Sequence, residues 1–429
     1  MSASDTDSDF ASAPLPESMT VPGWRVALII ASFTFALPGF LNGAQTGLAL
    51  GFGKAVLAAL LAGIILCAGA CLTAIISVRT RLTTYLLVQR SFGMRGAALV
   101  NLVIAIIHFC WFGVNVSFFG DAMVAAQDAG YGLPGNFSIF VICGSIMITI
   151  STIFGFKTLD RLAMVAVPLV GVILVAVCIK SVGSNPVDLA PAAEPPVPMS
   201  FGIALSALVG GNMLTVAAMP DLSRFIRTER GALVGMALSF PLASPVLMVI
   251  SALIALSTLN TDIMQLVTGL GFGAPALVML LLSVWTINAL NLYSASLSMA
   301  ATFPGVPQWV YVVGGGVVGC IFALMGIINY FIPFLVTLGL IIPPIAAIYV
   351  IDGFMAFRSD TQLPPVAIRW QAIAVWLFSL AVTMPATSFG LTLTTVPALD
   401  ATLLAAAAYL AMLYFAGTPE EQDTQQDTP

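Results

Sequence analysis

The sequence is poor in charge. Only 8% of its 429 residues are Asp, Glu, Lys or Arg, against about 25% in ordinary soluble domains. A soluble protein with so few charges has too little polar surface to cover itself, whereas 59% of this chain is hydrophobic. Its mean hydropathy is +1.05. We therefore expect hydrocarbon to be the solvent for most of the chain, which predicts an all-α integral membrane protein.

Several functional classes lack their usual signals. The six cysteines all lie in apolar runs without metal-ligand spacing, which predicts small buried side chains and no disulfide framework. No basic region precedes the first apolar run, so we expect no cleavable signal peptide. The chain shows no nucleic-acid-binding surface, no paired intramembrane carboxylates and no Ser–His arrangement of recognisable spacing. These absences predict no enzymatic activity and no bound cofactor.

Long apolar runs are abundant. A window of about 20 residues per span predicts about twelve transmembrane helices. They cover residues 24–50, 54–78, 97–126, 135–156, 161–182, 200–222, 231–256, 273–301, 307–327, 329–351, 367–387 and 395–416.

The basic residues orient these spans. With both termini in the cytoplasm, twelve of the fourteen Lys and Arg residues face inward and only Lys54 and Lys180 face outward. Cytoplasmic loops of membrane proteins are enriched in Lys and Arg. The chain is therefore predicted to be a multi-pass protein of the cytoplasmic (inner) membrane. The polar tails, residues 1–23 and 417–429, are predicted to be disordered.

Two spans contain helix breakers near their middles. Span one reads FALPGFLNGAQTG, and span six reads LSALVGGNMLTVAAMP, with the break expected at Gly210–Gly211. Glycine also serves close helix packing, which is a plainer explanation for either one alone. Two interruptions five spans apart favour instead a transporter built from inverted repeats, in which freed backbone groups line a site.

Span three contains the only histidine of the chain, in HFCWFGVNV. His108, Trp111 and Asn115 are spaced so that they share one helix face. Such a face combines a flat stacking surface with hydrogen-bonding groups, which suits a planar heterocycle. A packing cluster is the simpler alternative. Polar residues inside a membrane nevertheless usually face a cavity or pathway.

Span eight is unusually polar. Its hydroxyl and amide residues predict either interhelical hydrogen bonds or ligands for a substrate or a hard cation. They are Thr286, Asn288, Asn291, Ser294, Ser296 and Ser298. Asn212 in span six is a further candidate. Near the end of that span, Asp221 is expected to pair with Arg224 at the cytoplasmic surface.

Four segments together resemble bacterial cytosine permeases of the nucleobase–cation symport family. They are TRLTTYLLVQRSFGMRG after span two, CWFGV in span three, VWTINALNLY in span eight and LIIPPIAAIYVIDGFM in span ten. The resemblance covers residues 24–416. It implies a leucine-transporter-like fold: a five-helix repeat (24–182), an external loop (183–199), an inverted five-helix repeat (200–351) and two extra helices (352–416).

The resemblance also implies a site, at which Trp111 stacks on the substrate. His108 stands where cytosine permeases carry glutamine, and Gly211–Asn212 stands where they carry Ser-Phe. Asn288 matches an asparagine of the family's helix 8 site. Because these replacements change the hydrogen-bond pattern, and an unpaired buried polar group costs about 1–3 kcal/mol, we expect a nucleobase-like heterocycle other than cytosine.

A coupling cation is implied as well. Sodium-coupled relatives hold Na⁺ through backbone carbonyls that correspond to Ala31, Thr34 and Ser283, and through two adjacent hydroxyls. Here Thr286 is followed by Ile287, which weakens such a site. Coupling to H⁺ through His108 is the alternative.

The resulting prediction is a secondary active transporter that imports a nucleobase or related planar heterocycle by cation-coupled alternating access, and that functions as a monomer. The runner-up is an amino-acid or other small-metabolite symporter of the same fold. A channel or a transporter-like receptor would share the fold without concentrative uptake.

Overall fold

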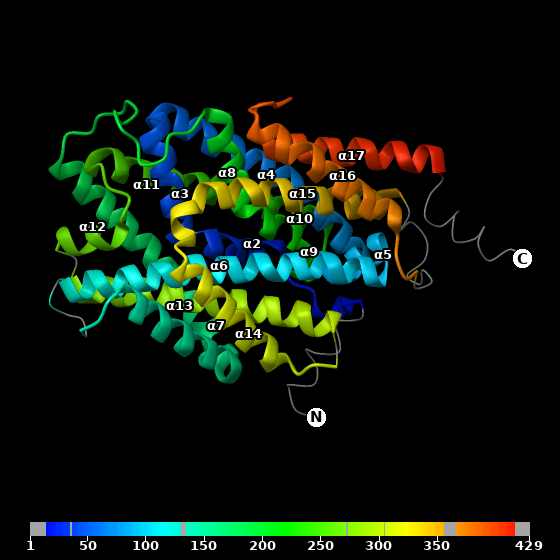
Figure 1. Ribbon diagram of the computed structural model, residues 1–429, viewed down its shortest axis with the longest axis horizontal. Coiled ribbons are helices and arrows are strands. Elements are labelled where there is room, and N and C mark those ends of the chain that lie inside the picture. Colours follow the sequence, from blue (N-terminus) through cyan, green and yellow to red (C-terminus); the bar gives the residue numbers. More distant parts are fainter. Residues whose placement is uncertain are drawn as a thin grey trace, which may run out of the picture.

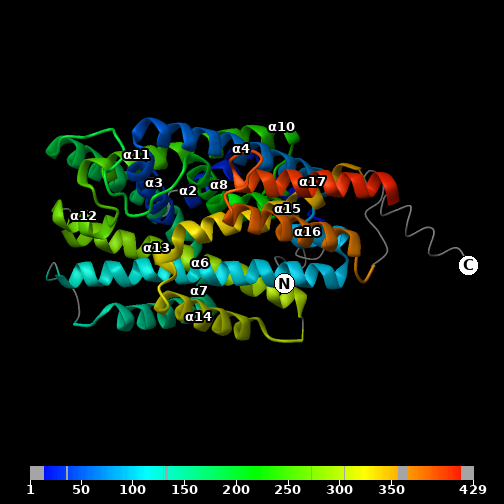
Figure 2. The same ribbon diagram turned by 45° about the horizontal axis from the view of Figure 1, so that its top comes forward.

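The computed structural model describes residues 14–34, 37–128, 130, 134–271, 273–303, 305–355 and 366–416. Within these ranges the regular structure is helical, apart from one isolated β-bridge between Val21 and Ile226. Most of the long helices follow the long axis of the molecule (Figures 1 and 2). The N-terminal tail predicted to be disordered covers residues 1–23, of which 1–13 lie outside the described residues, as does the C-terminal tail 417–429.

The helices correspond closely to the predicted spans. The long ones are α4 (Phe52–Thr80), α6 (Met94–Asp128), α7 (Phe137–Ser184), α13 (Gly273–Thr302), α15 (Phe331–Met355), α16 (Trp370–Ser388) and α17 (Pro397–Ala416). The shorter ones are η1 (Glu17–Met19), α2 (Gly23–Thr34), α3 (Leu37–Leu50), α5 (Thr84–Phe92), α8 (Phe201–Ala217), α9 (Met219–Ser223), α10 (Glu229–Leu238), the π-helical turn η2 (Ser239–Ala243), α11 (Ser244–Thr258), α12 (Ile263–Gly269), α14 (Gln308–Leu324) and η3 (Ile327–Tyr330).

Six of the described helices are long and apolar enough to cross a bilayer. In lipid, a helix satisfies its own backbone hydrogen bonds, which is why such apolar runs fold this way. The six segments are Phe52–Thr80, Met94–Asp128, Glu229–Thr258, Ile327–Met355, Trp370–Ser388 and Pro397–Phe415.

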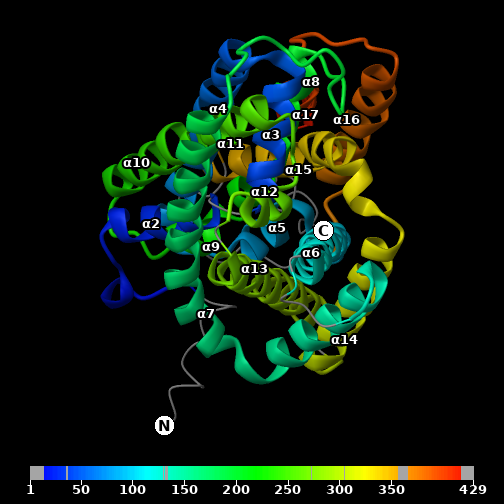
Figure 3. The ribbon, with the colours of Figure 1, turned by 90° about the vertical axis from the view of Figure 1, so that its left-hand side faces the viewer.

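Spans four and five form one helix, whereas the sequence predicts two spans separated near residues 157–160. The assigned helix α7 runs without interruption from Phe137 to Ser184, and its ribbon bends sharply at the foot of Figure 3. The segment KTLDR at the expected turn contains neither glycine nor proline. Without either of these residues, the helix continues across the expected turn.

In span one, α2 ends at Thr34 and α3 begins at Leu37, and residues 35–36 between them lie outside the described part of the chain. Span six is divided, but the predicted position of its break is wrong. Helix α8 continues through Gly210 and Gly211 to Ala217, and the break lies at Ala218.

Pro220 explains the position of the second break. It lacks an N–H and so leaves the carbonyl of Val216, four residues earlier, without its helical donor. The Thr73 hydroxyl of α4 donates to that carbonyl oxygen at 3.1 Å. The Tyr349 hydroxyl of α15 donates to the neighbouring Ala217 oxygen at 2.7 Å. Side chains from two other helices therefore satisfy the backbone that the break exposes.

Close helix packing explains the glycines instead. A Cβ on Gly210 would lie 1.9 Å from the backbone oxygen of Leu335, so only glycine lets α8 approach α15 this closely. Gly43 and Gly47 serve the same purpose where α3 packs on Met248 and Ala252 of α11. In Figure 3, α3 and α13 lie nearer the middle of the bundle and α7, α14 and α10 lie on its rim.

Part of the predicted N-terminal tail is held against the bundle. Leu15 is buried, and its N–H donates to the Arg81 oxygen at the end of α4. Val21 exchanges backbone hydrogen bonds with Phe225 and Arg227 after α9. The chain just before α2 is thereby fixed to the chain just after α9.

Candidate functional site

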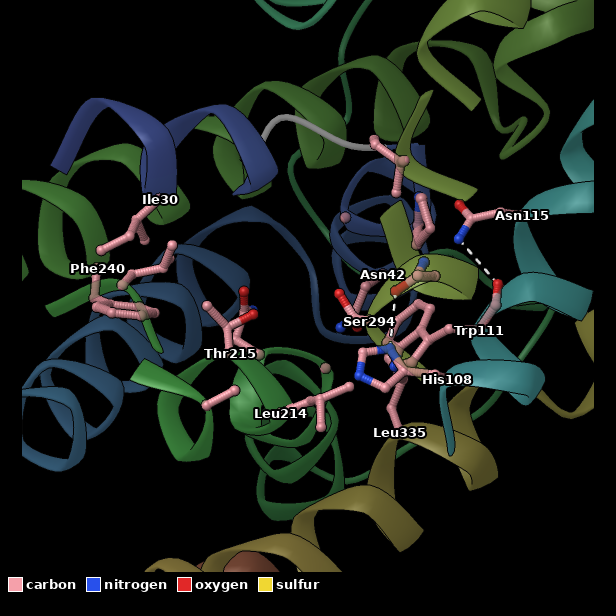
Figure 4. Close-up of a pocket in the computed structure, with 18 of the residues that line it drawn as sticks. Ile30, Asn42, His108, Trp111, Asn115, Leu214, Thr215, Phe240, Ser294 and Leu335 are labelled. Atoms are coloured by element: carbon pink, nitrogen blue, oxygen red, sulfur yellow. Dashed lines mark hydrogen bonds between the residues drawn. The ribbon is translucent and has the colours of Figure 1, made fainter. Parts of the chain in front are cut away.

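A cavity of about 360 Å³ lies where the two interrupted spans meet the long helices. This volume is within the range of about 300–1,000 Å³ typical of small-molecule sites. Its wall combines residues of α2, α3, α6, α8, α9, η2, α11, α13 and α15. In Figure 4 the apolar side chains of Ile30 and Phe240 lie at the opposite end from His108 and Trp111, with Leu214 and Thr215 between them.

The His108 imidazole has a defined partner at the polar end. Its Nδ1 lies 3.2 Å from Oδ1 of Asn291 on α13. An amide oxygen only accepts, so Nδ1 carries a hydrogen, and in the neutral ring Nε2 is then an acceptor. Asn291 also lines the cavity, and its Nδ2 remains as a donor. The pair therefore presents one acceptor and one donor to a ligand.

The indole of Trp111 is held in place from the side. The rings of Phe331 and Phe334 on α15 meet it edge-on, with centroid distances of 6.3 and 5.4 Å and interplanar angles of 79° and 71°. Such T-shaped contacts are favourable for aromatic pairs. Trp111 and Phe331 both line the cavity, so a rigid aromatic surface borders the His108–Asn291 pair.

Three further asparagines of the wall each donate a hydrogen bond through the side-chain Nδ2. Asn42 Nδ2 donates to the Ala207 oxygen, Asn115 Nδ2 to the Trp111 oxygen and Asn212 Nδ2 to the Leu208 oxygen. The Oδ1 atoms of Asn42 and Asn115 are buried and have no hydrogen-bond partner among the described residues. Both oxygens are buried out of contact with the open space of the cavity, so His108 Nε2 and the Asn291 amide are the groups of this end that we assign to a ligand.

Of the five residues predicted to bind substrate, the structure brings four to the cavity: His108, Trp111, Gly211 and Asn212. The fifth, Asn288, is fully buried away from it, and its Nδ2 donates to the Phe112 oxygen of α6 at 3.1 Å. Asn288 thus ties α13 to α6, and it is Asn291, one helical turn later, that faces the cavity.

Sequence reasoning missed three polar residues of the wall: Asn42, Thr215 and Asp221. Asn42 lies in the glycine-containing motif FALPGFLNGAQTG of span one, which is the signal that could have identified it. For Asn291 and Ser294 the sequence indicates only that they belong to a polar span. For Thr215 the sequence offers no comparable signal.

Asp221 is an exposed residue of α9, and it has contacts beyond the ion pair expected from the sequence. Its carboxylate lines the cavity, and Oδ1 accepts the N–H of Thr84, the first residue of α5, at 2.8 Å. A carboxylate at a helix N-terminus is favoured by the unpaired amides there. Asp221 therefore connects the cavity wall to the helix of the TRLTTYLLVQRSFG segment.

The side chains of the predicted Na⁺ site, Ala31, Thr34, Ser283 and Thr286, lie outside the described residues. The four residues belong to the helices α2 and α13. Ile287, which the sequence places beside Thr286, contributes to the cavity wall.

At the level of sequence, known proteins similar to this chain are permeases. Residues 24–410 match the family described as "Permease for cytosine/purines, uracil, thiamine, allantoin". The cytosine permeases of Escherichia coli strain K12 and of Escherichia coli O157:H7 are each 26% identical over 381 residues, which is 87% of this chain and 88% of the relative.

Solved structures agree in fold. The inward-facing conformation of Mhp1 matches with a TM-score of 0.80 at 18% identity, covering 96% of each chain. Mhp1 in a closed conformation with bromovinylhydantoin bound matches with a TM-score of 0.74 at 19% identity, covering 97% of this chain and 98% of Mhp1. An outward-open Na⁺-coupled sialic acid symporter gives 0.66 at 11% identity, covering 92% and 90%. The predicted leucine-transporter-like fold, with two extra C-terminal helices, is thereby confirmed.

Proposed function

The chain belongs to the family of permeases for cytosine/purines, uracil, thiamine and allantoin, and from this premise we propose that its cavity binds a planar N–H-rich heterocycle for import. It is a multi-pass membrane transporter that works by cation-coupled alternating access. The cytosine permeases and the nucleobase–cation symporter Mhp1 are its relatives in sequence and fold.

One observation carries the proposal: the aromatic surface of Trp111 borders the His108–Asn291 pair, which presents one acceptor and one donor. A buried polar atom left unpaired costs about 1–3 kcal/mol. The ring N–H and carbonyl groups along one edge of a nucleobase or a hydantoin match this acceptor–donor pair. Stacking on Trp111 adds about 1–3 kcal/mol for a base.

The stacking surface of Trp111 favours an aromatic ring over the amino-acid alternative. Cytosine itself is also disfavoured relative to related heterocycles. This chain has His108 and Asn212 where the resemblance places glutamine and phenylalanine, so both the hydrogen-bond pattern and the second apolar wall differ.

We propose that the cavity represents a state open toward the cytoplasm. Its wall includes Leu222 and Asp221 of α9, close to the basic cluster of Arg81, Arg224 and Arg227 that the positive-inside rule assigns to the cytoplasm. In this orientation both termini are cytoplasmic and the protein lies in the inner membrane. We further propose that residues 24–182 and 200–351 form the two repeats, and that the protein functions as a monomer.

Replacing His108 by glutamine should change selectivity more than it changes folding. Glutamine removes the Nε2 acceptor and offers an amide that both donates and accepts. We expect affinity for the natural heterocycle to fall about tenfold and the response to cytosine to increase. Thermal-shift titrations of the purified protein with pyrimidines, purines and hydantoins measure both effects. Unchanged selectivity would contradict the proposed role of His108.

We propose Na⁺ as the coupling ion, because the sialic acid symporter of the same fold is Na⁺-coupled. Uptake of the heterocycle identified by the titrations should then rise several-fold when proteoliposomes carry an inward Na⁺ gradient. A pH gradient of equal driving force should have little effect. Uptake that follows the pH gradient and ignores Na⁺ would establish H⁺ coupling instead. Absence of concentrative uptake under either gradient would argue for a channel or a receptor.

A further inference from the structure

One face of α3 carries three buried oxygens that the site described above does not explain. Asn42, Gln45 and Thr46 are 3%, 9% and 2% exposed. At 100° per residue, their positions fall within an arc of about 100° on the helix. Asn42 Oδ1, Gln45 Oε1 and Thr46 Oγ1 all have no hydrogen-bond partner among the described residues.

Thr46 differs from most buried hydroxyls of this protein. In a membrane helix, Ser and Thr commonly donate to the carbonyl four residues earlier. Ser251 on the neighbouring α11 does so to Leu247, and Thr383 on α16 does so to Ser379. The Thr46 hydroxyl makes no such bond to Asn42. Its oxygen is therefore available to a ligand.

The amide of Asn42 is fixed in orientation. Its Nδ2 donates to the Ala207 oxygen of α8 at 3.3 Å, which leaves Oδ1 as the free atom. Gly43 and Gly47 hold the adjacent side of α3 tightly against α11, since a Cβ on either would come within 3.0 Å of Ser251 or Ala252. The three oxygens thus belong to a helix whose position is set by its packing.

The chemistry of these three oxygens indicates which kind of ion they bind. Two amide oxygens and one hydroxyl are hard, neutral ligands, and residues 24–50 contain no Asp or Glu. Divalent Ca²⁺ and Mg²⁺ sites rely on carboxylates, whereas a monovalent ion needs no negative ligand. We propose that Asn42, Gln45 and Thr46 contribute to a Na⁺ site on α3, distinct from the residues that the family resemblance suggests.

The position of Asn42 gives this ion a role. Asn42 lines the heterocycle cavity, while Gln45 and Thr46 lie one turn further along α3. Na⁺ bound there holds the segment of α3 that forms part of the cavity wall, so the ion and the heterocycle bind cooperatively. This role in coupling rests on the proposed function, although binding of the ion itself does not.

The test is a Na⁺ titration of the purified full-length protein, with thermal unfolding as the readout and KCl added to keep ionic strength constant. The wild type should show a saturable stabilisation by Na⁺. Thr46→Val should weaken the apparent Na⁺ affinity about tenfold or more, and Gln45→Leu should do the same. Thr46→Ser keeps the hydroxyl, so its Na⁺ affinity should stay close to the wild-type value.

Thr383→Val is the matched control, because it removes a buried threonine hydroxyl on α16 that is bonded within its own helix. It should leave the Na⁺ affinity unchanged. If Thr46→Val does not fold, Gln45→Leu decides the result. A wild type indifferent to Na⁺, or variants that bind Na⁺ as the wild type does, would overturn the site.

The same preparation separates this inference from the proposed function. Heterocycle binding, measured without Na⁺ in potassium buffer, tests the cavity alone. Heterocycle binding without any effect of Thr46→Val on Na⁺ affinity rejects the α3 site and leaves the function standing. A Na⁺ response that depends on Thr46, without binding of any heterocycle, supports the site and rejects the proposed substrate class.

Discussion

Gly210→Ala should prevent the protein from accumulating in a folded form. The new methyl group would lie 1.9 Å from the Leu335 oxygen and 2.9 Å from the Gly339 nitrogen, both of them backbone atoms that no rotamer change moves. Overpacking of a core costs typically about 1–3 kcal/mol, and this contact demands separation of two whole helices, so we expect more than about 3 kcal/mol. Fluorescence-detected size-exclusion of the expressed variant measures the loss.

Gly211→Ala is the control, because it places the same methyl group one residue further along α8. There the nearest atom would be a Leu335 methyl carbon at 3.5 Å, an ordinary contact. This variant should fold and elute as the wild type does, although its methyl group enters the cavity wall. If Gly210→Ala proved as stable as Gly211→Ala, the packing of α8 on α15 would differ from the one described.

Trp111→Ala should reduce transport roughly 10- to 100-fold. It removes the surface on which a heterocycle stacks, worth about 1–3 kcal/mol for a base, and each 1.4 kcal/mol corresponds to a factor of ten. It also leaves Phe331 and Phe334 without their common ring partner. Initial uptake rates at low substrate concentration in proteoliposomes give the value, after correction for the amount of folded protein.

Two further variants separate stacking from general damage. Trp111→Phe keeps an aromatic ring and should recover a substantial part of the uptake. Trp309→Ala removes a tryptophan that is 56% exposed on α14 and should leave uptake unchanged. Full activity of Trp111→Ala would exclude the stacking role and favour the alternative in which His108, Trp111 and Asn115 form a packing cluster.

The membrane architecture follows from the sequence because its determinants are local. Apolar runs of about 20 residues must become helices in lipid, since no water is present to satisfy their backbone. The periodicity of HFCWFGVNV likewise places His108 and Trp111 on one face without knowledge of any other helix. These two features established the class of the protein and one wall of its cavity.

Other details required the tertiary structure. Asn288 and Asn291 are both amides on α13, and the sequence offers no means of telling which one reaches the cavity. The rotation of α13 about its own axis decides which of the two reaches the cavity. Asn288 Nδ2 donates to the Phe112 oxygen of α6, and Asn291 faces the cavity. The Gly210–Gly211 pair likewise resembles a helix break in sequence, while Pro220 provides the actual break and Gly210 provides a close contact with α15.

The sequence by itself determined that this chain is a multi-span membrane transporter of the nucleobase permease type, because hydropathy, charge asymmetry and short motifs act within one segment. Only the tertiary structure decided which polar atoms share the cavity, which helix backbones touch, and which oxygens on α3 remain without partners. These depend on helix rotation and on contacts between residues more than a hundred positions apart, such as Asn42 with Ala207. No local pattern encodes that information.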